Sequence, residues 1–96
     1  VVLKGSGTII FHNDKSVQKW GLCSSGNPGM ATGGMGDVLT GIIAGILAQG
    51  LNIRDAVEAS VDLHAKSADL MSLEVGEAGL TPSDVIEGLR ILLRYD

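Results

Sequence analysis

Residues 26–41 read GNPGMATGGMGDVLTG, a glycine-rich loop that leads directly into an apolar segment of helical length. Asp37 lies at the junction and is the only formally charged residue between positions 21 and 50. Because the faces of the segment are small or uncharged nearly all round, we expect an interior helix that packs against other elements. Its larger apolar side chains recur at helical spacing, at Val38, Leu39, Ile42, Ile43, Ile46 and Leu47.

The start of this helix has the chemistry of an anion site. A helix N-terminus presents N–H groups without intrahelical acceptors and a partial positive charge, and glycines before it leave room for a phosphate. Thr32 or Gly33 is the expected N-cap. Asp37, in the first turn, is either a helix cap or a base that takes a proton from a hydroxyl beside a bound phosphate. The pattern alone favours neither interpretation.

Three β-type runs precede the loop. Residues 1–3 are apolar, residues 8–12 are rich in β-forming side chains, and residues 16–20 alternate after a polar turn. We therefore expect a strand followed by a hairpin. The KGSGT link at residues 4–8 is either a flexible connection or a second anion contact, made by Lys4 and the amides of the turn.

Two further helices are expected after the apolar one. Gly50 should end the first helix, and Asn52 should cap a second helix over residues 53–73. Thr81 and Pro82 should start the third, because threonine is a favoured N-cap and proline is tolerated at the first helical position.

Composition limits the functional classes. The chain has 96 residues and a net charge of −4, without a basic cluster, which argues against a nucleic-acid partner. The apolar run at residues 42–47 is interrupted by glycine and too short to span a bilayer. The single Cys23 excludes an internal disulfide and fits a reducing cytosol. With only three aromatic residues and no initiator methionine, we interpret the chain as a piece of a larger domain.

Several of these stretches together resemble the NAD(P)H-hydrate dehydratases, nucleotide-dependent repair enzymes of the ribokinase-like superfamily. The resemblance is carried by residues 26–41 and by the KGSGT run at residues 4–8. It continues through LHAKSAD at residues 63–69 and GLTPSDVI at residues 79–86. The likeness includes His64 and Asp69, to which we assign no chemistry.

For the fold, the resemblance implies a ribokinase-like α/β domain with three α/β/α layers and a mainly parallel sheet. Residues 1–96 would be the C-terminal part of that single domain, supplying late strands with a hairpin and then three helices. The expected partners are the rest of its own domain and further copies of the chain in a homo-oligomer. No nucleic acid or membrane is expected, and the expected location is cytoplasmic.

For the activity, the resemblance implies dehydration of the hydrate forms of NADH and NADPH. ADP or ATP would pass a phosphoryl group to the hydrate hydroxyl, followed by elimination, with Mg²⁺ accompanying the nucleotide and no metal held by dedicated protein ligands. Asp37 would bind the substrate and act as the catalytic base. The nucleotide-binding residues would be Lys4, Gly5, Ser6, Gly7, Thr8, Asn27, Pro28, Gly29, Met30, Ala31, Thr32, Gly33, Gly34, Met35 and Gly36.

Two alternatives remain open at this point. The first is a ribokinase-like small-molecule kinase that phosphorylates a vitamin precursor or a sugar hydroxyl and releases a stable phosphorylated product. The second is a nucleotide-binding or structural remnant without enzymatic activity.

We predict that residues 1–96 alone fold poorly and are inactive, because most of the sheet and of the substrate pocket would lie elsewhere in the domain. Thermal unfolding followed by circular dichroism should be broad for this fragment and sharp for the full-length polypeptide. A cooperative melt of the fragment alone would refute the prediction about folding.

Overall fold

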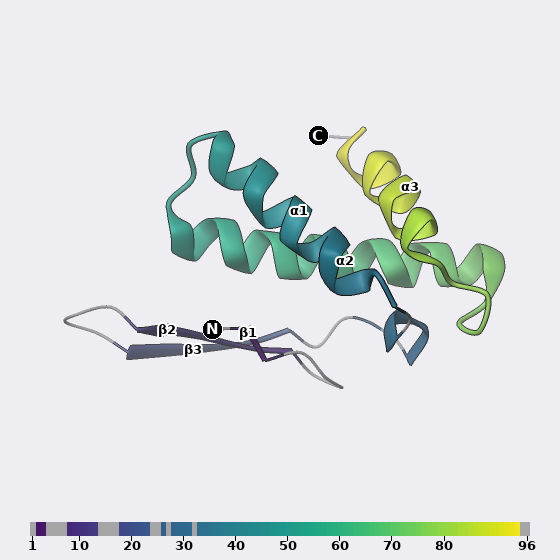
Figure 1. The fold of residues 1–96 in the computed structure, drawn as a ribbon, viewed down its shortest axis with the longest axis horizontal. Coiled ribbons are helices and arrows are strands. Elements are labelled where there is room, and N and C mark those ends of the chain that lie inside the picture. Colours follow the sequence, from purple (N-terminus) through teal and green to yellow (C-terminus); the bar gives the residue numbers. More distant parts are fainter. Residues whose placement is uncertain are drawn as a thin grey trace.

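The computed structural model describes residues 2–3, 8–13, 18–23, 26, 28–31 and 33–94. Three strands are followed by a short 3₁₀ helix and three α-helices (Figure 1). In chain order they are β1 (Val2–Leu3), β2 (Thr8–Asn13), β3 (Gln18–Cys23), η1 (Pro28–Ala31), α1 (Met35–Ala48), α2 (Ile53–Val75) and α3 (Pro82–Leu93).

The strands form one sheet in the order β1-β2-β3, and both neighbouring pairs are antiparallel. Val2 is opposite Ile10 in the first pair, and Thr8 is opposite Cys23 in the second. The third strand was expected at residues 16–20, but it begins at Gln18 and ends at Cys23. Its last residue pairs with Thr8, the first residue of β2. The turn between β2 and β3, at residues 14–17, lies outside the described residues.

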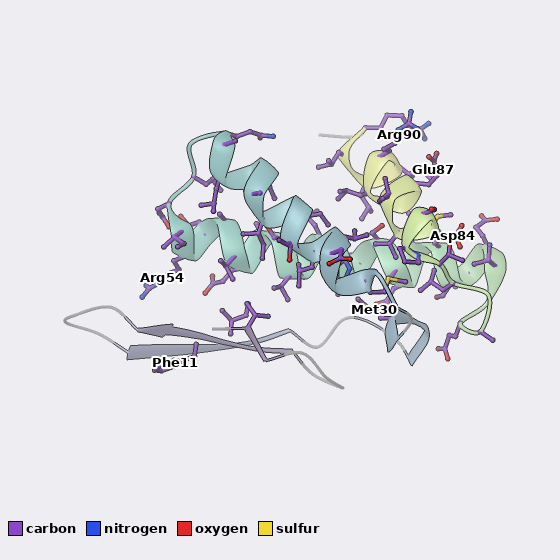
Figure 2. All side chains as sticks on the ribbon, in the orientation of Figure 1. Phe11, Met30, Arg54, Asp84, Glu87 and Arg90 are labelled. Carbon is purple, nitrogen blue, oxygen red and sulfur yellow. The ribbon has the colours of Figure 1, made fainter. Side chains whose placement is uncertain are left out.

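The helices cover one face of this sheet. Ile10 of β2 is 4% exposed and packs in one cluster with Leu39 of α1 and Val61 of α2. Phe11, the next residue of the strand, lies on the face away from the helices (Figure 2), as the alternation of side chains along a strand requires. In the described part of the chain, the helices therefore pack against one face of the sheet, and the face that carries Phe11 has no helix on it.

The long helix α2 is the central element. In Figure 1 it runs alongside the sheet, while α3 and most of α1 lie on its other side. A second buried cluster joins all three helices where α1 and α3 begin, and its members are Met35, Ala68, Leu80 and Val85. Ala68 and Val85 have no exposed surface, so this crossing fixes the two helix starts against α2.

The helix ends confirm most of the expected signals. The Asn52 side chain accepts a hydrogen bond of 2.9 Å from the Asp55 backbone N–H at the start of α2. Thr81 and Asp84 form a capping box around the first turn of α3, with Pro82 at its first position. Gly50, with φ of 98°, follows the end of α1.

Two expectations about α1 differ from the structure. Its N-cap is Gly34 rather than Thr32 or Gly33, because Gly34 takes the left-handed conformation with φ of 95° and the helix begins at Met35. Its expected burial on most sides is limited to Met35 and Leu39. The other residues of α1 are partly or fully exposed, and among them Val38 and Ile43 pack at the edges of the two buried clusters.

The end of α2 also differs slightly from expectation, since the helix continues past Leu73 to Val75 and is closed by Gly76. None of the helices that the structure describes is both long and apolar enough to cross a membrane.

The close contact of α2 with α3 depends on a glycine. Gly88 is buried, and a Cβ built there would lie 2.5 Å from Ser67 Oγ and 2.7 Å from Met71 Cγ. The Ser67 hydroxyl donates to the backbone carbonyl of Val85, which ties the two helices together at the same level. A larger residue at 88 must therefore separate the helices or displace this hydroxyl.

We predict that Gly88→Ala lowers the free energy of unfolding of the full-length protein by about 1–3 kcal/mol, because overpacking outweighs the better helix propensity of alanine. Urea denaturation measures the change. Arg90→Ala is the control on the same helix. It removes only an exposed ion pair with Glu87 and should change stability by less than about 0.5 kcal/mol. Equal effects of the two substitutions would contradict the prediction.

Candidate functional site

The start of α1 is chemically different from the starts of the other two helices. Asn52 and Thr81 cap α2 and α3 with their side chains, whereas α1 begins after Gly34, which has no side chain to cap it. The first hydrogen bond of the α1 ladder runs from the Val38 N–H to the Gly34 carbonyl, at 3.2 Å. The N–H groups of the first turn precede this bond and are the ones that can meet an anion.

Glycines keep the approach to this helix start open. Gly33 is exposed, and nothing lies within 4 Å of a Cβ built on it. Gly34 is more constrained, since a Cβ there would lie 3.0 Å from Cγ of Pro82, the first residue of α3. The N-termini of α1 and α3 therefore lie beside each other, with Gly34 at the contact.

The two methionines of the glycine-rich loop are attached to the core. Met35 is 4% exposed and belongs to the cluster at the helix crossing, and Met30 packs against that cluster (Figure 2). Of the predicted nucleotide-binding residues, these two can therefore offer a ligand mainly backbone groups. Their side chains instead hold η1 and the start of α1 in place.

Asp37 is the third residue of α1 and is exposed. No hydrogen bond or ion pair joins its carboxylate to another described residue, so within that part of the chain it does not act as a helix cap. It lies at the edge of an open groove of about 750 Å³.

This groove is lined by residues of α1, α2 and α3 and is largely apolar. Ile42 and Ile46 line one side, Leu89 lines the other, and Ala59 and Leu63 form the α2 part. Gly41 and Gly45 also line it, and a Cβ built on either of them meets nothing within 4 Å. The sequence spacing of these glycines permits close approach of another element, but no described residue makes that approach.

Part of the predicted nucleotide site lies outside the described residues, namely Lys4, Gly5, Ser6, Gly7, Asn27 and Thr32. Thr8 is the first residue of β2, and Pro28, Gly29, Met30 and Ala31 form η1. The described structure brings together Gly33, Gly34, Met35, Gly36 and Asp37 at the start of α1.

The residues of α2 that resemble family positions occupy two different environments. His64 is 5% exposed, as a structural histidine would be. Asp69 is partly buried and accepts a hydrogen bond from the backbone N–H of Gly26, at 2.8 Å. Sequence reasoning missed this contact because the two residues are distant along the chain. The signal in the sequence was that Asp69 lies one helical turn after the apolar Ala65, which places both residues on the same face of α2.

A metal site is not formed by the side chains that the structure describes. Across residues 2–3, 8–13, 18–23, 26, 28–31 and 33–94, no three His, Cys, Asp or Glu side chains lie close enough together to hold a metal ion. Asp37 is a single carboxylate and supplies at most one side-chain ligand at the start of α1.

Comparisons with known proteins agree with the motifs. The sequence model that describes NAD(P)H-hydrate dehydratases matches residues 1–90. A relative in Coxiella burnetii, named bifunctional NAD(P)H-hydrate repair enzyme Nnr, is 50% identical over 93 residues, which are 97% of this chain and 18% of the relative. The enzyme of the same name in Vibrio cholerae has the same identity and coverage.

A shorter relative in Neisseria meningitidis is named ADP-dependent (S)-NAD(P)H-hydrate dehydratase. It is 40% identical over 93 residues, which are 96% of this chain and 30% of the relative. The chain therefore spans less than a third of the length of these curated relatives.

We predict that the two neighbouring glycines respond differently to alanine. Gly34→Ala should destabilise the full-length protein by about 1–2 kcal/mol, because the left-handed conformation disfavours a Cβ and Pro82 lies against it. Gly33→Ala, the matched control, should change the free energy of unfolding by less than about 0.5 kcal/mol. Urea denaturation of both variants checks this, and a larger loss for Gly33→Ala would be inconsistent with the described geometry.

Proposed function

The chain belongs to the NAD(P)H-hydrate dehydratase family, and on this premise we propose that the complete protein dehydrates the hydrate forms of NADH and NADPH with a nucleotide as phosphoryl donor. The observation that carries the proposal is the start of α1, where an open glycine approach meets a helix N-terminus without a side-chain cap. Asp37 in the same first turn supplies the only formal charge in residues 21–50.

ADP is the proposed donor, with ATP as the alternative. The support is the printed name of the relative in Neisseria meningitidis, together with that of an Enterococcus faecalis relative, which is also called ADP-dependent. Mg²⁺ would accompany the nucleotide, because this ion commonly keeps several waters and binds through substrate phosphates and one or two carboxylates.

In the proposed reaction, the backbone N–H groups at the start of α1 bind oxygens of the transferred phosphoryl group. The hydroxyl of the hydrate attacks phosphorus, and its proton passes to the carboxylate of Asp37. The nucleotide leaves as AMP from ADP, or as ADP from ATP. The phosphate then departs with the former hydroxyl oxygen while the adjacent ring carbon loses a proton and a C=C bond forms, which restores the reduced cofactor. The exposed Asp37 suits this role, since its carboxylate makes no hydrogen bond or ion pair to another described residue.

We also propose that residues 1–96 are the C-terminal part of one ribokinase-like domain with three α/β/α layers. Further strands and helices would cover three surfaces of the described part of the chain. These are the open groove along α1, the exposed Gly41 and Gly45, and the face of the sheet that carries Phe11. The remaining strands would supply the parallel part of the sheet, since those described are antiparallel.

Lys4, Gly5, Ser6, Gly7 and Thr8 remain proposed nucleotide contacts, on the strength of their motif. A homo-oligomer and a cytoplasmic location are likewise proposals, the second supported by the single cysteine.

We predict that Asp37→Asn in the full-length protein lowers kcat for hydrate conversion by about 100-fold or more. The asparagine amide has nearly the size of the carboxylate but cannot accept the proton. The assay follows consumption of NADH hydrate and release of phosphate, with ADP and ATP in parallel. Asp62→Asn is the control, since Asp62 is an exposed aspartate of α2 paired with Lys66 at 2.8 Å.

Near-normal conversion by Asp37→Asn would remove Asp37 from the base role. A stable phosphorylated product from the unmodified protein would instead favour the small-molecule kinase. Binding of ADP without conversion of either substrate class would favour a remnant without enzymatic activity.

A further inference from the structure

The glycine-rich loop has a polar attachment to α2 that the proposed reaction does not use. The backbone N–H of Gly26 donates to Oδ2 of Asp69 over 2.8 Å, in a partly buried position and across 43 residues of sequence. A hydrogen bond to an ionised acceptor is among the stronger ones in proteins, and partial burial limits competition from water.

The backbone at Gly26 is shaped for this contact. Its φ of 118° is a conformation that side chains rarely tolerate, and a Cβ there would lie 3.0 Å from Met30 Sδ and 3.8 Å from Ala65 Cβ. Ala65 and Asp69 are one helical turn apart on α2, so they lie on the same face of the helix. Gly26 lies near Ala65 on this face and donates its hydrogen bond to Asp69.

Apolar contacts also hold the loop. Met30 and Met35 pack at the cluster around Ala68, which lies between Ala65 and Asp69 on α2. Apolar contacts are not directional, whereas a hydrogen bond to a carboxylate is. The bond from Gly26 to Asp69 is therefore a directional contact that orients the chain as it enters η1.

We propose that Asp69 is a positioning residue for nucleotide binding, acting through Gly26 to hold the loop that leads to the start of α1. This inference rests on the proposed function, because it takes the loop to bind the nucleotide phosphates. Asp69 orders backbone N–H groups before the ligand arrives, and it does not touch the reacting atoms. Its loss is therefore expected to weaken nucleotide binding more than it slows the chemical step.

The test compares full-length variants at position 69. Asp69→Ala removes the acceptor, Asp69→Leu removes it while keeping similar bulk, and Asp69→Asn retains one acceptor oxygen without the charge. Asp62→Ala is the matched control, because Asp62 lies on the same helix and pairs with exposed Lys66. Steady-state kinetics give KM for ADP and kcat, calorimetry gives the Kd for ADP, and hydrogen exchange by mass spectrometry reports on peptides that contain Gly26 and η1.

Asp69→Ala and Asp69→Leu should raise KM and Kd for ADP by about ten-fold, as loss of one charge-assisted hydrogen bond implies, with a smaller change in kcat. Exchange in the Gly26 and η1 peptides should become faster without ADP present. Asp69→Asn should recover part of both losses, and Asp62→Ala should match the unmodified protein.

Unchanged exchange and unchanged KM in Asp69→Leu would overturn the inference while leaving the proposed function intact. A kcat loss without a change in KM or Kd would also overturn it. If the unmodified protein neither bound ADP nor converted the hydrate, the proposed function and the nucleotide part of this inference would both fall. The exchange data would then decide by themselves whether Asp69 orders the loop.

Discussion

The buried contact at the crossing of α2 with the starts of α1 and α3 is the interaction on which the rest of the structure depends. Met35, Ala68 and Val85 meet there, one from each helix, and each is almost or completely buried. Small residues allow the close approach, as Ala68 and Gly88 show on α2 and α3. Because Met35 is also the first residue of α1, a packing contact of the core determines where the N–H groups of the candidate anion site lie.

Features that depend on local chemistry were predictable from the sequence. Asn52 and Thr81 cap helices through bonds to residues three positions ahead, so the responsible groups are adjacent in the printed sequence. The N-cap of α1 was predicted wrongly because threonine is a favoured cap by propensity. The left-handed backbone at Gly34, beside Pro82, depends on α3, which is distant in sequence. The existence of the loop and of the helix after it was still evident from the glycines and the apolar spacing.

Features that depend on distant partners were not predictable in the same way. The apolar pattern of α1 indicated burial nearly all round, but a pattern does not say which segments provide the cover, and the described residues cover only the side of Met35 and Leu39. The bond from Gly26 to Asp69 is similar, because an aspartate on a helix usually faces solvent. For Asp37, the sequence identified the position, and the structure adds that its carboxylate makes no hydrogen bond to any other described residue. The role of base is our proposal.

The bond between Gly26 and Asp69 also couples the stability of the loop to that of the helices. It closes a long stretch of chain that contains η1, α1 and the first part of α2, and closing such a stretch costs conformational entropy before the contact is gained. The bond therefore needs Asp69 in place on α2, and the packing of α1 against α2 shortens the distance that the stretch must close. Any ligand that requires the assembled loop stabilises these helices through thermodynamic linkage.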